Sequence, residues 1–165
     1  LATSRHEMQL HVRKHGVLRK GFTQLSNYCR AKGIELAVVT HGLDFYVDAL
    51  LDEAGLGWLP TYAVEAIFTK NGLQYGYHYT KPTCTEYGNC KCLLIERYRS
   101  NGNKVVYIGD GISDLCPALQ ADFVFARSLL LEECRAKGIT HMELHDFSDV
   151  ITALERHKII PEAIY

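Results

Sequence analysis

The chain has 165 residues, 47% of them hydrophobic, and a formal net charge of -1 at pH 7 with a pI near 6.8. This length favours one domain with one sizeable core. The near-neutral charge argues against nucleic acid as a partner. No apolar run approaches the roughly 18 to 20 residues of a membrane span, and the N-terminus lacks a signal-peptide pattern, so we expect no membrane partner and a cytoplasmic location.

The apolar pattern of the first half predicts alternating helices and strands. Gly33 and Gly55 each follow a helical pattern as left-handed caps. Asn71-Gly72 between two strand-like runs is a strong hairpin signal. The expected elements are a polar helix over 1–14, a helix over 19–32, a buried strand over 34–40, a helix over 43–54 and hairpin strands over 62–68 and 73–79.

The second half repeats the order of strand, glycine turn and helix. The expected elements are helices over 89–100, 114–120, 128–137 and 146–157 and strands over 104–108, 123–126 and 142–144. Strands that alternate with helices imply right-handed crossovers. We therefore predict an α/β fold with a doubly wound, mainly parallel sheet and a small β-hairpin.

Two groups of polar residues follow predicted strands, where open α/β sheets bind their ligands. After the first strand, Thr40, His41 and Gly42 provide a hydroxyl, an imidazole and an exposed backbone amide. The hydroxyl and the amide suit a phosphoryl oxygen. His41 is expected either to contact substrate or to be an ordinary loop histidine.

The second group lies in the turn Gly109-Asp110-Gly111, which leads to Asp114. Mg²⁺ prefers oxygen ligands and keeps several waters, so Asp110 and Asp114 with a substrate phosphate would complete a site. The alternative is that Asp110 or Ser113 only caps the helix that begins near Asp114, as aspartate after a strand commonly does.

Three stretches resemble motifs two, three and four of haloacid-dehalogenase-type phosphatases, in the same order. They are VVTHGLDFYVDALL, the lysine within GNCKCLLIERY, and VVYIGDGISDLCPALQADFVFAR. The resemblance covers 18 to about 149 and implies a Rossmann-like core. Within the superfamily it is closest to the methionine-salvage phosphatases that act on 2-hydroxy-3-keto-5-methylthiopentenyl-1-phosphate, followed by the phosphoserine and phosphocholine phosphatases.

The resemblance also implies roles for single residues. Thr40 matches the hydroxyl that binds the transferring phosphoryl group, with the Gly42 amide beside it. Lys91 matches the motif-three lysine that balances negative charge, although a lone lysine here would be read as a solvated helix residue. Asp110 matches the direct Mg²⁺ ligand, and Asp114 the acid that binds the metal through water or orients Lys91.

One catalytic part is absent from the sequence. The family attacks phosphorus with an aspartate of an Asp-x-Asp motif, and no Asp-x-Asp occurs in these 165 residues. Asp44, Asp48 and Asp52 share a helix face and are expected to be solvated. We expect motif one, most of a helical cap and the central strand to lie upstream, so that 1–17 is the end of the cap and 18–165 is the core.

Cys84, Cys90 and Cys92 form a cluster, with His78 close in sequence. Their spacing is unusual for zinc, which favours C-x2-C or C-x4-C. A disulfide between Cys84 and Cys90 is a second alternative. Reduced thiols of a family motif are preferred for a cytosolic protein.

The leading hypothesis is a Mg²⁺-dependent phosphatase for a small phosphorylated metabolite. A non-catalytic phosphate binder that has lost the nucleophile is the alternative from another class. A receiver or flavodoxin-like module explains the alternation of elements but not Thr40, Lys91 and Asp110 together. The phosphatase hypothesis predicts that these three residues and Asp114 converge at the carboxyl ends of the strands; it leaves the oligomeric state open.

Overall fold

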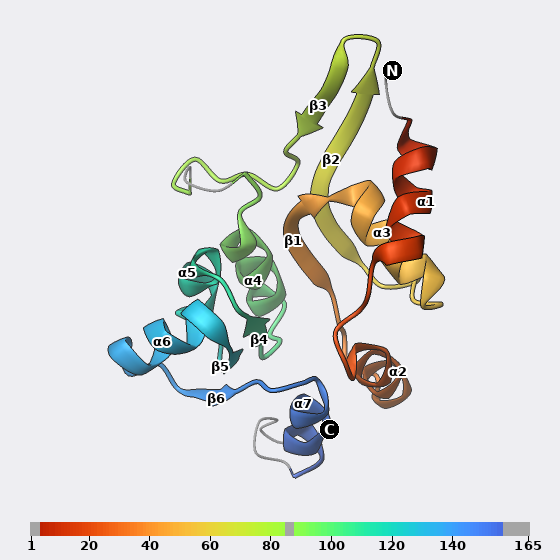
Figure 1. The fold of residues 1–165 in the computed structure, drawn as a ribbon. Helices are drawn as coiled ribbons and strands as arrows, with labels where there is room; N and C mark the ends of the chain where they lie inside the picture. The colour runs from red at the N-terminus through yellow and green to blue at the C-terminus, as the bar shows by residue number, and fades with distance from the viewer. Residues whose placement is uncertain (1–3, 85–87, 157–165) are drawn as a thin grey trace. The chain divides into compact units, whose positions relative to one another are not determined.

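The computed structural model describes residues 4–84 and 88–156, which divide into two compact units. The first unit comprises Leu1–Arg19 and Ser26–Cys90, and the second comprises Lys20–Leu25 and Lys91–Tyr165. Figure 1 traces both along the chain. Residues 1–3 of the first predicted helix and residue 157 of the last lie outside the described residues.

The first unit packs two helices against each other and against a sheet. Helix α1 (Arg5–His15) begins with a capping box, in which Ser4 Oγ accepts from the Glu7 amide at 3.2 Å and the Glu7 carboxylate accepts from the Ser4 amide at 2.7 Å. Figure 1 shows α1 alongside α3 (Asp44–Glu53). Val12 of α1 joins Phe45, Ala49 and Ala66 in a buried apolar cluster.

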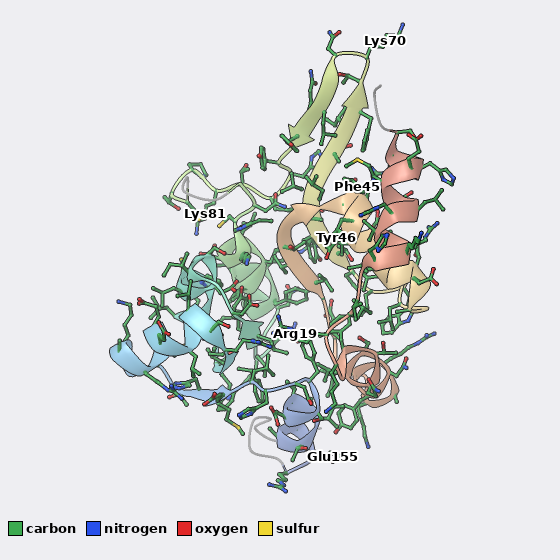
Figure 2. All side chains as sticks on the ribbon, in the orientation of Figure 1. Arg19, Phe45, Tyr46, Lys70, Lys81 and Glu155 are labelled. Atoms are coloured by element: carbon green, nitrogen blue, oxygen red, sulfur yellow. The ribbon has the colours of Figure 1, made fainter. Side chains whose placement is uncertain are left out.

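Helix α3 illustrates how one face of a helix is selected for burial. Phe45 is 4% exposed, whereas its neighbour Tyr46 is 44% exposed, because adjacent positions point about 100° apart around a helix. Both side chains are labelled in Figure 2. The helix ends near Gly55, which adopts the predicted left-handed conformation with φ of 70°.

The sheet of the first unit has the order β1-β2-β3. Strand β1 (Val38–Leu43) is parallel to β2 (Thr61–Thr69), and β2 pairs antiparallel with β3 (Gly72–Gly76). Lys70, labelled in Figure 2, lies at the tip of this hairpin. The hairpin is therefore confirmed, although its second strand ends three residues before the predicted position.

The prediction for the first strand is wrong at both ends. The strand begins at Val38, not Ile34, because its partner β2 begins only at Thr61 and the Val38 amide donates to the Pro60 carbonyl at 2.9 Å. It also continues to Leu43. The register shifts between Val39, which faces Tyr62, and Leu43, which faces Val64, so residues 40–42 bulge out of the ladder instead of following its end.

The second unit contains a purely parallel sheet with the order β4-β5-β6. Its elements are α4 (Lys91–Ser100), β4 (Val106–Gly109), the short 3₁₀ helix η1 (Ile112–Asp114), α5 (Leu115–Ala118), β5 (Phe123–Ala126), α6 (Ser128–Lys137), β6 (His141–Glu143) and α7 (Ser148–Glu155). The bounds of β5 and α6 are those predicted. Gly138 ends α6 in the left-handed conformation, with φ of 66°.

The core of this unit lies between the sheet and α6, where Val124, Ala126, Leu130 and Cys134 are at most 1% exposed. Residues Lys20–Leu25 include the first residues of α2 (Phe22–Lys32). They belong to the second unit, where they contact the start of α7. Phe22 and Phe147 meet edge to face at 5.2 Å. Helices and parallel strands in both units confirm the predicted α/β class.

Within 4–84 and 88–156, no helix has the length and apolar content that a membrane crossing requires. In the described residues, the strands form two three-stranded sheets, β1-β2-β3 and β4-β5-β6. The proposed division into a cap remnant over 1–17 and a core over 18–165 stays a prediction, as does the central strand from an upstream segment.

Candidate active site

Four hydrogen bonds hold the carboxylate of Asp114 in the second unit, and this residue is 5% exposed. Its Oδ1 accepts from Lys91 Nζ at 2.5 Å and from the Tyr107 hydroxyl at 2.6 Å. Its Oδ2 accepts from the amides of Asp110 at 2.9 Å and Gly111 at 2.8 Å. These donors fill the lone-pair positions that a carboxylate offers, so the side chain is fixed in place.

Lys91 reaches this carboxylate from the first residue of α4. Its side chain is only 11% exposed, and its Nζ also lies 3.4 Å from Ser113 Oγ. A buried ammonium without a partner carries a large desolvation penalty, and the ion pair with Asp114 offsets it. Lys91 is therefore not the solvated helix lysine of the alternative interpretation.

The surroundings of Asp114 shift the pKa values of two groups. Burial by itself raises the pKa of Asp114, but hydrogen bonds from Lys91 and Tyr107 outweigh it and hold the pKa below its usual value. Burial, with the charge of Asp114 next to it, raises the pKa of Tyr107 well above its usual value. At neutral pH the arrangement is thus a charged carboxylate with a phenol and an ammonium as donors.

Asp110 differs from Asp114 in that it is exposed. It comes directly after β4, and its backbone amide is held by Asp114. An exposed carboxylate at the carboxyl end of a parallel strand has the donor chemistry that Mg²⁺ prefers. The residues present fit this metal, with Asp110 better placed for direct coordination than Asp114, whose oxygens already accept hydrogen bonds.

Gly109, the last residue of β4, leaves room for the Asp114 side chain. A Cβ at this position would lie 2.8 Å from both Cβ and Cγ of Asp114. At Gly111 the nearest atom to an added Cβ is Asp114 Oδ2 at 3.6 Å, an ordinary contact. An added side chain would therefore clash with Asp114 at Gly109 but not at Gly111.

Gly109→Ala is expected to lower the free energy of unfolding by about 1–3 kcal/mol, because the added methyl group displaces a buried, fully bonded carboxylate. Urea denaturation followed by circular dichroism would measure this. Gly111→Ala is the matched control and should change stability by less than about 0.5 kcal/mol. Equal effects at the two positions would contradict the close packing of Gly109 on Asp114.

Tyr107→Phe is expected to destabilise the protein by about 1.5–3 kcal/mol at pH 7, because it removes a hydrogen bond to a charged, buried acceptor. Since the pKa of Asp114 is lowered in the folded protein, this stabilisation is present above the pKa of an ordinary aspartate and is lost as the pH falls through the folded pKa. The difference from wild type should therefore shrink in acid.

The matched control is Tyr75→Phe, which alters a tyrosine that is 52% exposed. Urea denaturation at neutral and acidic pH should give nearly the same stability for this variant and the wild type. A loss in Tyr107→Phe that does not depend on pH would show that its hydroxyl does not respond to the charge of Asp114.

The residues predicted to bind phosphate, Thr40, His41 and Gly42, lie in the bulge of β1, in the first unit. The Gly42 amide donates to Thr40 Oγ1 at 2.9 Å, which leaves the hydroxyl proton of Thr40 for another acceptor. His41 Nε2 donates to the backbone carbonyl of Asn89 at 2.8 Å. Convergence of Thr40 with Asp110 stays a prediction, because each unit is described by itself.

Asn89 and Tyr107 are site residues that sequence reasoning missed. Asn89 is 1% exposed, and its Nδ2 lies 3.5 Å from the Thr40 carbonyl. In the described part of the chain, its Oδ1 has no hydrogen-bond partner. A buried acceptor without a donor costs about 1–3 kcal/mol. The position of Asn89 within the GNCK stretch could have indicated that it belongs to the site. For Tyr107, the only indication in the sequence was a hydroxyl group in an otherwise aliphatic strand.

Asp44 corrects the expectation of a solvated aspartate face. Its carboxylate pairs with Arg5 at 2.6 Å and accepts from the amides of Phe45 at 2.7 Å and Ala66 at 3.0 Å, so it ties α1, α3 and β2 together. Asp48 is half-buried. Its pKa is raised, mainly by burial and also by the nearby negative charge of Asp44. Both line a cavity of about 330 Å³ that includes none of the predicted site residues.

The cysteine cluster gives no metal site in the part of the chain that the structure describes, where no three histidine, cysteine or acidic side chains are placed to hold an ion. Cys90 is 1% exposed and Cys92 is 4% exposed. All six cysteines are thiols in the structure. Cys84 and Cys90 both belong to the first unit, and Cys92 belongs to the second.

Comparison with known proteins identifies the family. Residues 2–119 match the haloacid dehalogenase-like hydrolases, which is more than half of the chain. The chain belongs to the haloacid dehalogenase-like hydrolase family. This confirms the predicted resemblance. The assignment of motifs two, three and four to the bulge of β1, the start of α4 and the turn after β4 stays a prediction.

Two curated relatives are named 2-hydroxy-3-keto-5-methylthiopentenyl-1-phosphate phosphatase. The protein from Brevibacillus brevis is 32% identical over 144 residues, covering 84% of this chain and 64% of the relative. That from Geobacillus kaustophilus is 34% identical over 158 residues, covering 90% of this chain and 68% of the relative. This haloacid dehalogenase-like chain thus spans about two thirds of the length of these relatives.

Solved structures agree on the fold. A phospho-aspartyl intermediate analogue of phosphoserine phosphatase has a TM-score of 0.66 and 19% identity, covering 92% of this chain and 70% of that one. A phosphoserine phosphohydrolase-like protein from Francisella tularensis also has a TM-score of 0.66, with 17% identity. At these identities the likeness shows the Rossmann-like phosphatase fold.

Proposed function

We propose that the full-length protein, including any residues that precede Leu1, is a Mg²⁺-dependent phosphomonoesterase for 2-hydroxy-3-keto-5-methylthiopentenyl-1-phosphate. The observation that carries the proposal is the buried pair of Lys91 and Asp114 at 2.5 Å, next to an exposed Asp110 in the family's fourth motif. The choice of substrate rests on the names of the curated relatives. A small phosphorylated metabolite is thus the proposed partner.

In this proposal, an aspartate from an upstream Asp-x-Asp motif attacks phosphorus and forms an aspartyl-phosphate. Phosphoryl transfer depends mainly on in-line positioning and on neutralising charge on the equatorial oxygens. The ammonium of Lys91, held by Asp114, supplies a fixed positive charge. Thr40 donates its hydroxyl proton to a phosphoryl oxygen, and the Gly42 amide, which donates to Thr40 Oγ1, orients that hydroxyl.

Asp110 is the proposed direct ligand of Mg²⁺. The metal would supply positive charge against the phosphate and needs few protein carboxylates, because it keeps several waters. Asp114 acts on Lys91 and on the backbone of the turn, and any contact with the metal is through water. We also propose a cytoplasmic location, since six cysteines that remain thiols fit a reducing compartment.

The test measures phosphate release by the full-length protein from 2-hydroxy-3-keto-5-methylthiopentenyl-1-phosphate, phosphoserine and phosphocholine, with Mg²⁺ and with a chelator. We expect kcat/KM for the first substrate to exceed the others by at least about 10²-fold, because a site built to hydrogen-bond one substrate rejects others. Activity should disappear with the chelator. Mg²⁺ should also raise Tm in the wild type and have less effect on Asp110→Asn.

Each alternative has its own outcome. Higher kcat/KM for phosphoserine or phosphocholine would replace the proposed substrate and retain the reaction. Phosphate binding without turnover of any ester would favour the non-catalytic relative. A Tm shift with Mg²⁺ that Asp110→Asn leaves unchanged would remove Asp110 from the metal site.

A further inference from the structure

Two thiols of the second unit lie unusually close together. Cys92 Sγ and Cys116 Sγ are 2.7 Å apart, although 24 residues separate them in the chain. A disulfide bond is about 2.05 Å long, so the sulfur atoms need to approach by only about 0.7 Å to bond. This proximity is created by the fold, since Cys92 lies in the first turn of α4 and Cys116 lies in α5.

The two thiols differ in their access to solvent. Cys92 is buried, at 4% exposure, whereas Cys116 is exposed. The side-chain amide of Gln120 donates to Cys116 Sγ at 3.7 Å. An exposed thiol backed by a buried one is the arrangement of a reactive cysteine and its resolving cysteine. Cys134, in the same unit, is fully buried and offers an internal comparison.

We propose that Cys92 and Cys116 form a reversible disulfide when the protein meets hydrogen peroxide. The Cys116 sulfur attacks one peroxide oxygen, the O–O bond breaks, and Cys116 becomes a sulfenic acid as one water leaves. The Cys92 sulfur then attacks the Cys116 sulfur, the S–O bond breaks, and a second water leaves. Two electrons pass from the sulfurs to peroxide, and both thiol protons end in water.

The bond would lie beside the buried ion pair, which joins α4 to η1. Cys92 directly follows Lys91, and Cys116 lies two residues after Asp114. The disulfide therefore adds a covalent link between α4 and α5 beside Lys91 and Asp114. It also diverts Cys116 from irreversible oxidation, since a sulfenic acid with a neighbouring thiol condenses to a disulfide. This modification does not depend on the proposed phosphatase activity.

The experiment treats the full-length protein with a small excess of hydrogen peroxide, alkylates the remaining thiols in denaturant and digests it with trypsin without reduction. Cleavage after lysine and arginine places Cys92 in peptide 92–97 and Cys116 in peptide 105–127, each with a single cysteine. Mass spectrometry should find these two peptides cross-linked. Dithiothreitol should release them, and Cys134 in peptide 128–135 should stay alkylated.

Two variants separate this pair from general oxidation. Cys116→Ser should abolish the cross-link, whereas Cys134→Ser should retain it. The oxidised wild type should melt at a higher temperature than the reduced protein, because the link restricts the unfolded chain, and Cys116→Ser should show no such increase. Recovery of Cys116 as sulfinic acid with Cys92 still alkylated, or cross-links spread over several cysteines, would overturn the proposal.

Discussion

The 165-residue chain by itself is expected to release no phosphate from an aryl phosphate in the presence of Mg²⁺. The same chain joined to an upstream segment whose strand ends in Asp-x-Asp should be active, with a rate at least about 10⁴-fold higher. Lys91 and Thr40 can stabilise a transferring phosphoryl group, but neither can replace a carboxylate held in line with the leaving oxygen. A phosphate-release assay on both proteins, with circular dichroism to compare folding, measures the difference.

The control is the longer protein with the first aspartate of its Asp-x-Asp replaced by asparagine, which should be as inactive as the shorter chain. The shorter chain should also have the lower Tm, because the proposed central strand would bury apolar side chains on both faces. Mg²⁺-dependent turnover by the 165-residue chain that Lys91→Ala abolishes would show that it contains its own nucleophile.

Lys91→Ala in the active, longer protein is expected to lower kcat by about 10²–10³-fold with a smaller change in KM, because it removes a charge that acts on the transition state. Steady-state kinetics would measure both parameters. The matched control is Lys137→Ala, since Lys137 is 47% exposed in its side chain and pairs with Glu133 on the surface of α6. It should leave kcat unchanged.

Lys91→Ala should also destabilise the fold by about 3–5 kcal/mol, because it leaves a buried carboxylate without its cation. The double variant Lys91→Ala and Asp114→Asn separates folding from catalysis, as it removes both charges. It should recover part of the lost stability and stay inactive. A double variant that regained activity would show that Lys91 serves only to neutralise Asp114.

Local signals in the sequence predicted most elements well. The helix α6 and strand β5 have the predicted bounds, and Gly33 and Gly55 have the positive φ angles expected after helices. These features depend on residues close together in the chain, such as glycine at a left-handed position. The predicted start of β1 was wrong because the ends of a strand depend on its partner strand, which lies more than twenty residues away in the sequence.

The candidate site was predictable only in part. Motif order gave Lys91, Asp110 and Asp114, and the structure brings these into one unit. It could not give Tyr107, whose residue type suits a buried strand and whose role appears only when its hydroxyl meets Asp114. The neighbouring thiols of Cys92 and Cys116 were hidden for the same reason, because spacing along the chain does not report distance in the fold.

The two backbone bonds that Asp114 accepts have a consequence for the entropy of ligand binding. The amides of Asp110 and Gly111 are held by a buried carboxylate of the protein itself, at 2.9 and 2.8 Å. The turn is thus ordered before any ligand arrives, and a cation at the proposed Asp110 site would not have to order this backbone. Fixing a residue's backbone costs about 1–2 kcal/mol. In this turn the backbone is already fixed when the protein folds. The entropic cost of fixing it therefore does not weaken ligand binding.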